Sequence, residues 1–172
     1  MDTHFPNHEF SPADIEAMKP TMKVGILGTV NPAGQPHLSL IASLQASGPT
    51  QMIFGQFTEG TSKEHVRQNP KTGFLIMTLD KQVWRGKATF THTADRGPEF
   101  EMYNNTPMFR YNAYFGVHTV YYLDLVAQSG RQPLPMGRVV WAAVQTMLAR
   151  TLAGRRAATA VINPWTQQLF NK

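Results

Sequence analysis

A short polar segment near residue 60 has the residue types of a phosphate-binding helix start. Thr61, Ser62 and Lys63 open a predicted helix over 62–68. The free N–H groups and the positive dipole end of a helix start attract anions, and two hydroxyl groups and a lysine add donors and a full charge. Thr61 and Glu64 also fit a capping box, which would set where the helix begins. A capped surface helix has the same pattern, so these residues alone do not establish phosphate binding.

Six segments with strand-like patterns surround this helix. The turn Asn31–Gly34 joins the first two segments as a hairpin. The second strand alternates between two faces, which are Leu38, Leu40, Ala42 and Leu44 on one side and His37, Ser39, Ile41 and Ser43 on the other. We expect one face to pack on a core and the more polar face to line a cleft. The predicted strands are 22–30, 36–44, 51–57, 72–79, 82–92 and 117–128.

Helical patterns flank the strands. Ser11 and Pro12 predict a helix that begins with Ser11 as its cap and ends before Pro20. A second helical stretch is predicted over 97–105, and a short terminal helix from Pro164. Near the C-terminus, apolar residues at helical spacing predict a helix with a core or dimer face, formed by Val140, Val144, Met147, Leu148 and Leu152.

Composition excludes several classes of protein. The 172-residue chain has no cysteine, which removes disulfides, cysteine-ligated metals and a cysteine nucleophile. Its formal charge of +5 is scattered, and no basic run interleaved with aromatic residues indicates a nucleic-acid surface. No signal peptide and no membrane-spanning apolar run is visible, so we expect a cytoplasmic protein that binds neither nucleic acid nor membrane.

Three motifs in order resemble the FMN-binding split barrels, the relatives of pyridoxamine 5′-phosphate oxidase. The first is the hairpin that continues through Gly34–Ile41. The second is Thr61–Lys63 followed by Asn69-Pro70, and the third is the Gln-Val strand within Lys81–Ala88. The resemblance covers about residues 20–128. It implies a mainly β fold with helices, a six-stranded antiparallel Greek-key split barrel, with an N-terminal helix and a C-terminal helical extension. We expect an FMN-binding split-barrel domain over 1–130 and a helical extension of that domain over 131–172.

The resemblance also implies a homodimer with FMN at its interface and a set of flavin contacts. The residues implied for the phosphate are Thr61, Ser62 and Lys63. Those beside the ribityl chain or the ring are Gln56 and Phe57. Those along the isoalloxazine, partly through main-chain groups, are His37, Ser39, Leu40 and Ile41. Gln82 and Arg85 are implied to reach the ring or the phosphate, including from the partner subunit.

The chain departs from the oxidase in two places. The oxidase has an arginine in its second strand, where this chain has His37 and Ser39, and its Arg- and Trp-rich C-terminal signature is absent from 164–172. Activity on pyridoxamine phosphate is therefore not expected. The histidines lack a metal-ligand spacing, and no Ser-His-Asp arrangement is evident. Three hypotheses remain: an FMN-dependent oxidoreductase of unknown substrate and electron donor, a non-enzymatic flavin or electron carrier, and a split barrel that binds haem or a deazaflavin.

Overall fold

The computed structural model describes residues 5–58, 60–112, 116–137, 141 and 144–147. The chain forms two compact units, over 1–134 and 135–172, which are treated separately below. The described part of the second unit is helical at 136–137, 141 and 144–147. The terminal helix predicted from Pro164 lies outside the described residues.

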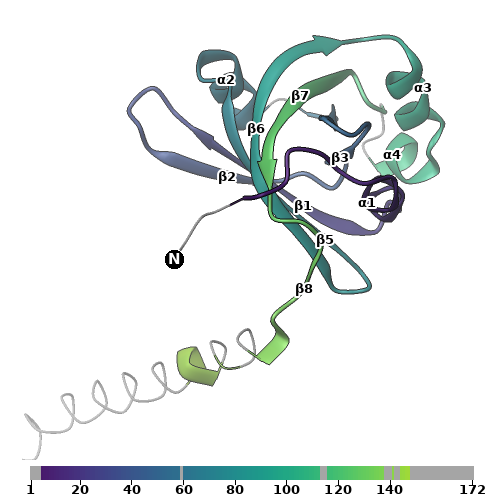
Figure 1. Cartoon of the computed structure of the whole chain (residues 1–172). Helices are drawn as coiled ribbons and strands as arrows, with labels where there is room; N and C mark the ends of the chain where they lie inside the picture. The colour runs from purple at the N-terminus through teal and green to yellow at the C-terminus, as the bar shows by residue number, and fades with distance from the viewer. Residues whose placement is uncertain (1–4, 59, 113–115, 138–140, 142–143, 148–172) are drawn as a thin grey trace, which may run out of the picture. The chain divides into compact units, whose positions relative to one another are not determined.

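The first unit is built on one antiparallel sheet. Its strands are β1 (Lys23–Val30), β2 (Pro36–Leu40), β3 (Gln45–Ala46), β4 (Gln51–Gln56), β5 (Lys71–Thr78), β6 (Gln82–Ala94), β7 (Thr119–Gln128) and β8 (Gln132–Pro133). The strand order is β2-β1-β5-β6-β7-β4-β3, with β8 paired to β6. Figure 1 shows that the sheet is strongly curled. The predicted mainly β split barrel is confirmed, with the two-residue strands β3 and β8 added to the six expected.

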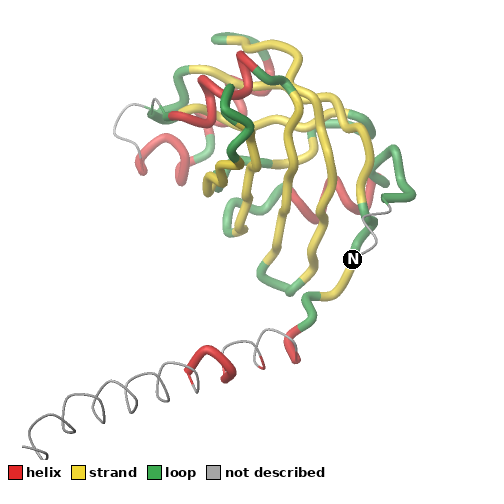
Figure 2. The backbone as a smooth tube through the Cα atoms, turned by 90° about the vertical axis from the view of Figure 1, so that its left-hand side faces the viewer, coloured by secondary structure: helices red, strands yellow, loops and turns green. Residues whose placement is uncertain are grey.

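Four helices pack on this sheet: α1 (Pro12–Met18), α2 (Thr61–Gln68), α3 (Pro98–Asn105) and α4 (Pro107–Asn112). Figure 2 shows these helices at the margins of the strands. The α1 cap is the predicted one, because Ser11 accepts a hydrogen bond from the Asp14 N–H and the Asp14 carboxylate accepts one from the Ser11 N–H. The capping box predicted for α2 is wrong. Its cap is Gly60, which has no side chain, so the helix begins at Thr61.

Two hydrophobic clusters form the core. The larger fills the barrel with fully buried side chains from several strands and α1, including Met18, Leu27, Phe54, Ile76, Trp84 and Tyr121. The smaller lies beneath α3 and α4 and includes Ile53, Tyr103, Phe109, Val117 and Val120. Within the barrel, the rings of Phe54 and Tyr121 stack with centroids 4.8 Å apart.

Ser43 joins the two ends of the strand order, because it lies in the chain between β2 and β3 and hydrogen-bonds to β4. We call this contact the seam. The Ser43 hydroxyl accepts a hydrogen bond from the Gly55 N–H at 3.0 Å and donates one to the Gly55 carbonyl at 3.1 Å. The Tyr103 hydroxyl donates to the Ser43 carbonyl at 2.7 Å. Only glycine fits at position 55, because a Cβ there would lie 2.8 Å from Val117. The chain after β2 is thereby held against β4.

Replacing Ser43 with alanine should loosen this seam. The hydroxyl is fully buried and serves both polar groups of Gly55, so we expect Ser43→Ala to lower the free energy of unfolding by about 1–3 kcal/mol. Chemical denaturation measures the change. Ser47→Ala is the control, because that half-buried hydroxyl makes one side-chain bond, to Gln51. Equal losses in the two variants would contradict the role of Ser43.

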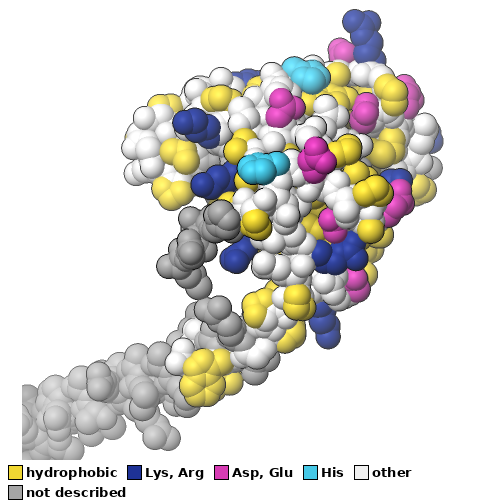
Figure 3. All heavy atoms as spheres, in the orientation of Figure 1, with side chains coloured by type: hydrophobic (Ala, Val, Ile, Leu, Met, Phe, Trp, Pro, Cys, Tyr) yellow, Lys and Arg dark blue, Asp and Glu magenta, His cyan; other side chains and the backbone are white. Residues whose placement is uncertain are grey.

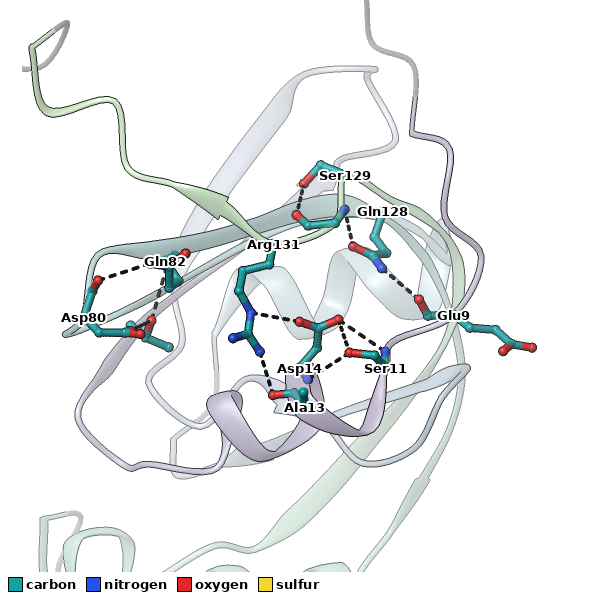
Figure 4. Close-up of polar contacts among 11 residues, drawn as sticks. Glu9, Ser11, Ala13, Asp14, Asp80, Gln82, Gln128, Ser129 and Arg131 are labelled. Atoms are coloured by element: carbon teal, nitrogen blue, oxygen red, sulfur yellow. Dashed lines mark hydrogen bonds and ion pairs between the residues drawn. The ribbon is translucent and has the colours of Figure 1, made fainter.

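Asp14 joins α1 to the chain that follows β7 (Figure 4). Its carboxylate accepts hydrogen bonds from the Ser11 hydroxyl at 2.7 Å and from Arg131 Nε at 3.1 Å. The Arg131 guanidinium also lies over the Trp84 ring, 5.3 Å from its centroid. Burial raises the pKa of Asp14, but the hydrogen bonds from Ser11 and Arg131 outweigh it and hold the pKa below its usual 3.8.

This lowered pKa makes the stability depend on acid pH. Because the folded state favours the charged carboxylate, its contribution is complete at neutral pH and is lost as the pH falls below 3.8 and through the lower folded pKa. Since Arg131 is 39% exposed, solvent weakens the pair, and we expect a contribution of about 1–2 kcal/mol. Denaturant unfolding of the native chain and of Asp14→Asn across this range measures it. Parallel pH profiles would contradict the assignment.

Candidate functional site

A pocket of about 280 Å³ lies where the chain after β2 approaches the end of β4. Its lining residues are Leu40, Ile41, Ala42, Phe54, Gly55, Phe57, Thr58 and Lys63. The walls are mainly apolar, and the one ionisable side chain among these residues is Lys63. The arrangement suits a flat aromatic group carrying an anionic end.

Four of the eleven predicted site residues line this pocket: Leu40, Ile41, Phe57 and Lys63. The sequence pattern did not identify Ala42, Phe54, Gly55 or Thr58. A glycine inside a strand was the available signal, because Gly55 marks a close approach of another segment.

Lys63 lies at the first turn of α2. Its amino group donates a hydrogen bond to the Thr58 carbonyl, and its N–H donates to the Gly60 carbonyl at 3.0 Å. The side chain therefore lies back over the loop between β4 and α2, beside the pocket. Thr61, the first helical residue, is exposed, and Ser62 is buried. The helix start brings a cation and backbone donors to one end of the pocket.

A chain of polar side chains links β2 to α2. His37 Nε2 lies 3.1 Å from the Ser39 hydroxyl, which is hydrogen-bonded to the Ser62 hydroxyl. The His37 and His65 rings meet edge to face, with centroids 5.5 Å apart. His65 Nδ1 in turn lies 3.2 Å from the Thr29 hydroxyl of β1. His37 and Ser39 thus contact α2 near its start, and neither residue lines the pocket.

The face of β2 that is buried differs from the predicted one. Because α2 covers the inner side of β1 and β2, the polar face of the strand packs on α2, and Leu38 and Leu40 point to solvent at 71% and 74% exposure. The expected packing of these two leucines on the core is therefore wrong. Beyond the end of β2, Leu44 does enter the core.

Three other predicted site residues lie outside the pocket: Gln56, Gln82 and Arg85. Gln56 is buried at the end of β4, and its carbonyl accepts a hydrogen bond from the His118 N–H at 2.9 Å. The Gln82 amide lies 3.4 Å from the Asp80 carbonyl in the turn before β6 (Figure 4). Arg85 is exposed on β6. None of the three lines the pocket.

A row of facing residues connects Arg85 to the edge of the pocket across the outer side of the sheet. Arg85 is opposite Leu75, Leu75 is opposite Ile26, and Ile26 is opposite Leu40. Directly opposed residues share a face of the sheet. Arg85 therefore lies on the same outer face as Leu40, three strands away.

This outer face is apolar. Leu38 and Leu40 on β2 are joined there by Met22, just before β1, and Leu79, just after β5, which are 60% and 73% exposed. Ile26 and Leu75 lie between them, half-buried. We call these six residues the outer apolar face. Exposed apolar surfaces on adjacent strands are typical of interaction sites.

The residues that the structure describes hold no group of three or more His, Cys, Asp or Glu side chains placed to bind a metal ion. Among the same residues, no helix has the length and apolarity needed to cross a membrane.

Solved structures with the same architecture exist, although no family model and no curated protein matches this sequence. The barrel superposes on an FMN-binding protein from Syntrophomonas wolfei with a TM-score of 0.56 at 15% identity, over 67% of this chain and 81% of that one. The chain is a split barrel. A candidate pyridoxamine 5′-phosphate oxidase from Lactobacillus delbrueckii gives 0.55 at 15% identity, over 72% and 95% of the two chains. An F420 reductase gives 0.53 at 14% identity, over 70% and 98%. At these identities the likeness establishes the fold.

Proposed function

We propose that this split barrel binds FMN in the pocket between β2 and β4 and works as an FMN-dependent oxidoreductase. One observation carries the proposal: Leu40, Ile41, Phe57 and Lys63, from separate segments of the chain, line one pocket beside the start of α2. Apolar walls suit the flavin ring, and the lysine and helix start suit its phosphate. We assign the protein to the cytoplasm, a reducing compartment that a chain without cysteine suits.

The polar chain from β2 to α2 refines the roles proposed for individual residues. Lys63, Thr61 and Ser62 bind the phosphate in this proposal. His37 and Ser39 join them there, because Ser39 is hydrogen-bonded to both His37 and Ser62. Leu40 and Ile41 lie along the ring.

Two further residues of β4 and its following loop are assigned to the middle of the flavin. Gln56 and Phe57 lie beside the ribityl chain or the ring in this proposal. Phe57 lines the pocket, and its ring also packs against Phe109, with centroids 5.6 Å apart. The buried, backbone-bonded end of β4 gives these two residues a fixed position.

We assign the outer apolar face to a homodimer. A second copy would remove Leu38, Leu40, Met22 and Leu79 from water, and a two-fold interface uses the same face on both copies. Since Arg85 shares this face with Leu40, the interface would carry Arg85 towards the partner's pocket. This supports the expectation that Arg85 contacts the flavin of the other subunit. Gln82, three residues earlier on β6, alternates to the opposite face of the strand, and its contact with the flavin stays a prediction.

The pocket residues position and enclose the cofactor. FMN supplies redox chemistry when bound, by accepting and releasing electrons. Lys63 is the one ionisable side chain in the described lining of the pocket. Because Lys63 is proposed to bind the phosphate, no side chain is assigned to proton transfer at the ring.

A deazaflavin is the second candidate ligand, because the barrel also superposes on an F420 reductase. No described residue specifically favours haem. Titrating the purified protein with FMN, F420 and haem, followed by fluorescence or absorbance, tests the ligand. Tight FMN binding supports the proposal, and binding of F420 alone would replace it. Rapid reduction of bound FMN by NADH or NADPH would identify an enzyme, whereas reduction only by a protein donor would identify a carrier.

A further inference from the structure

The net charge of the chain is confined to its second unit. Residues 1–134 contain eleven basic and eleven acidic residues, so the barrel is formally neutral. Residues 135–172 contain five basic residues and no acidic one, and carry the whole +5. On the face of the barrel seen in Figure 3, side chains of both signs are present. The second unit therefore attracts anionic partners, and the barrel as a whole does not.

The described helical residues of the second unit present large apolar side chains to solvent. Trp141 is 61% exposed, Val144 is 38% exposed and Met147 is 71% exposed. At a spacing of three residues they fall within an arc of about 120° on a helix. The sequence predicted a core or dimer face here. The exposure of Val144 and Met147 within one chain speaks against a core face, the dimer face stays a prediction, and the other three predicted residues lie outside the described residues. Met136, in the helical residues that precede them, is also 42% exposed.

From these two observations we infer that the second unit binds an anionic membrane surface through Met136, Trp141, Val144 and Met147. An exposed apolar stripe containing Trp, on a segment whose charges are all basic, is the composition of a helix that lies in the lipid headgroup region. We propose binding at the surface of the bilayer, the mode typical of helices with such a stripe. This inference is independent of the flavin proposal and replaces the expectation of no membrane partner.

Charge favours lipid over a second copy of the chain. Two copies of the second unit would bring two segments of +5 together, and the neutral barrel offers no compensating excess of acidic residues. Anionic headgroups supply that compensation, and each Lys or Arg near such a surface strengthens binding about fivefold.

Co-sedimentation of the full chain with vesicles tests the inference. We expect binding to vesicles of phosphatidylcholine with phosphatidylglycerol, weak binding to phosphatidylcholine alone, and loss of binding as salt is raised. Trp141→Ser should weaken binding about tenfold or more, because it removes the largest apolar side chain of the stripe. Arg150→Gln should weaken it about fivefold.

Two matched controls lie on the barrel. Val126→Ser removes an exposed apolar side chain there, and Lys71→Gln removes an exposed charge. Neither should change vesicle binding. Equal binding by Trp141→Ser and Val126→Ser would overturn the inference. So would a change of oligomeric state caused by Trp141→Ser without vesicles, because the stripe would then bind another copy. Binding to a DNA duplex that exceeds binding to the anionic vesicles would also overturn it.

Discussion

Leu38→Asp is expected to convert the protein from a dimer to a monomer and to abolish FMN binding. Leu38 is 71% exposed on β2, the edge strand of the outer apolar face, and does not line the pocket. A two-fold interface would bury the new carboxylate twice, at a cost on the order of 3 kcal/mol or more per copy. Because the proposed site takes residues from both subunits, flavin affinity should fall with the dimer. Light scattering and FMN titration measure the two effects on the same sample.

Val126→Asp is the matched control for this experiment. Val126 is a 47% exposed apolar residue on β7, outside the outer apolar face. The control should remain dimeric and bind FMN. A monomeric Leu38→Asp protein that retains full FMN affinity would separate the pocket from the interface and restrict the flavin site to one subunit. An unchanged dimer would show that the second copy docks elsewhere.

Lys63→Ala is expected to weaken FMN binding about tenfold to a hundredfold while leaving riboflavin binding within about twofold. Riboflavin lacks the phosphate, so the comparison isolates the part of the ligand that Lys63 is proposed to hold. The lysine is the one ionisable side chain in the described lining of the pocket, and it lies in the first turn of α2. Fluorescence titration of both ligands, with native and variant protein, gives the coupling free energy between lysine and phosphate.

Lys71→Ala is the control for this pair of titrations, since Lys71 is exposed at the start of β5. Lys23 is less suitable because it is buried, its amino group donates to the Pro20 carbonyl at 2.9 Å, and burial lowers its pKa to about 8. Equal loss of FMN and riboflavin in Lys63→Ala would mean that the lysine supports the pocket and does not bind the phosphate.

Local patterns predicted the strands well but not which face of β2 is buried. Alternation separates Leu38 and Leu40 from His37 and Ser39, and β1 and β5 alternate in burial as well. A period of two gives the two faces and does not say which one another element covers. Here α2 covers the polar face, so the hydrophobic residues were misassigned. The Ser11 cap of α1 was predictable because both of its partners are adjacent in sequence.

The site was predictable only in part, for a related reason. Thr61, Ser62 and Lys63 adjoin each other in sequence, but the pocket also needs the end of β2 beside the end of β4, and the sheet brings these together only by curling. The capping box failed because Gly60 begins the helix one residue earlier than Thr61 would. Gln82 and Arg85 do not line the pocket, and their proposed contact with the flavin of a second copy stays a prediction.

FMN binding is tested most directly by the visible spectrum of the freshly purified protein, with mass spectrometry of the compound that heat releases. We expect a yellow protein that yields FMN. A colourless protein that also fails to bind added FMN would contradict the proposed function. In that case α2, with Lys63 in its first turn, would be an ordinary surface helix on a split barrel.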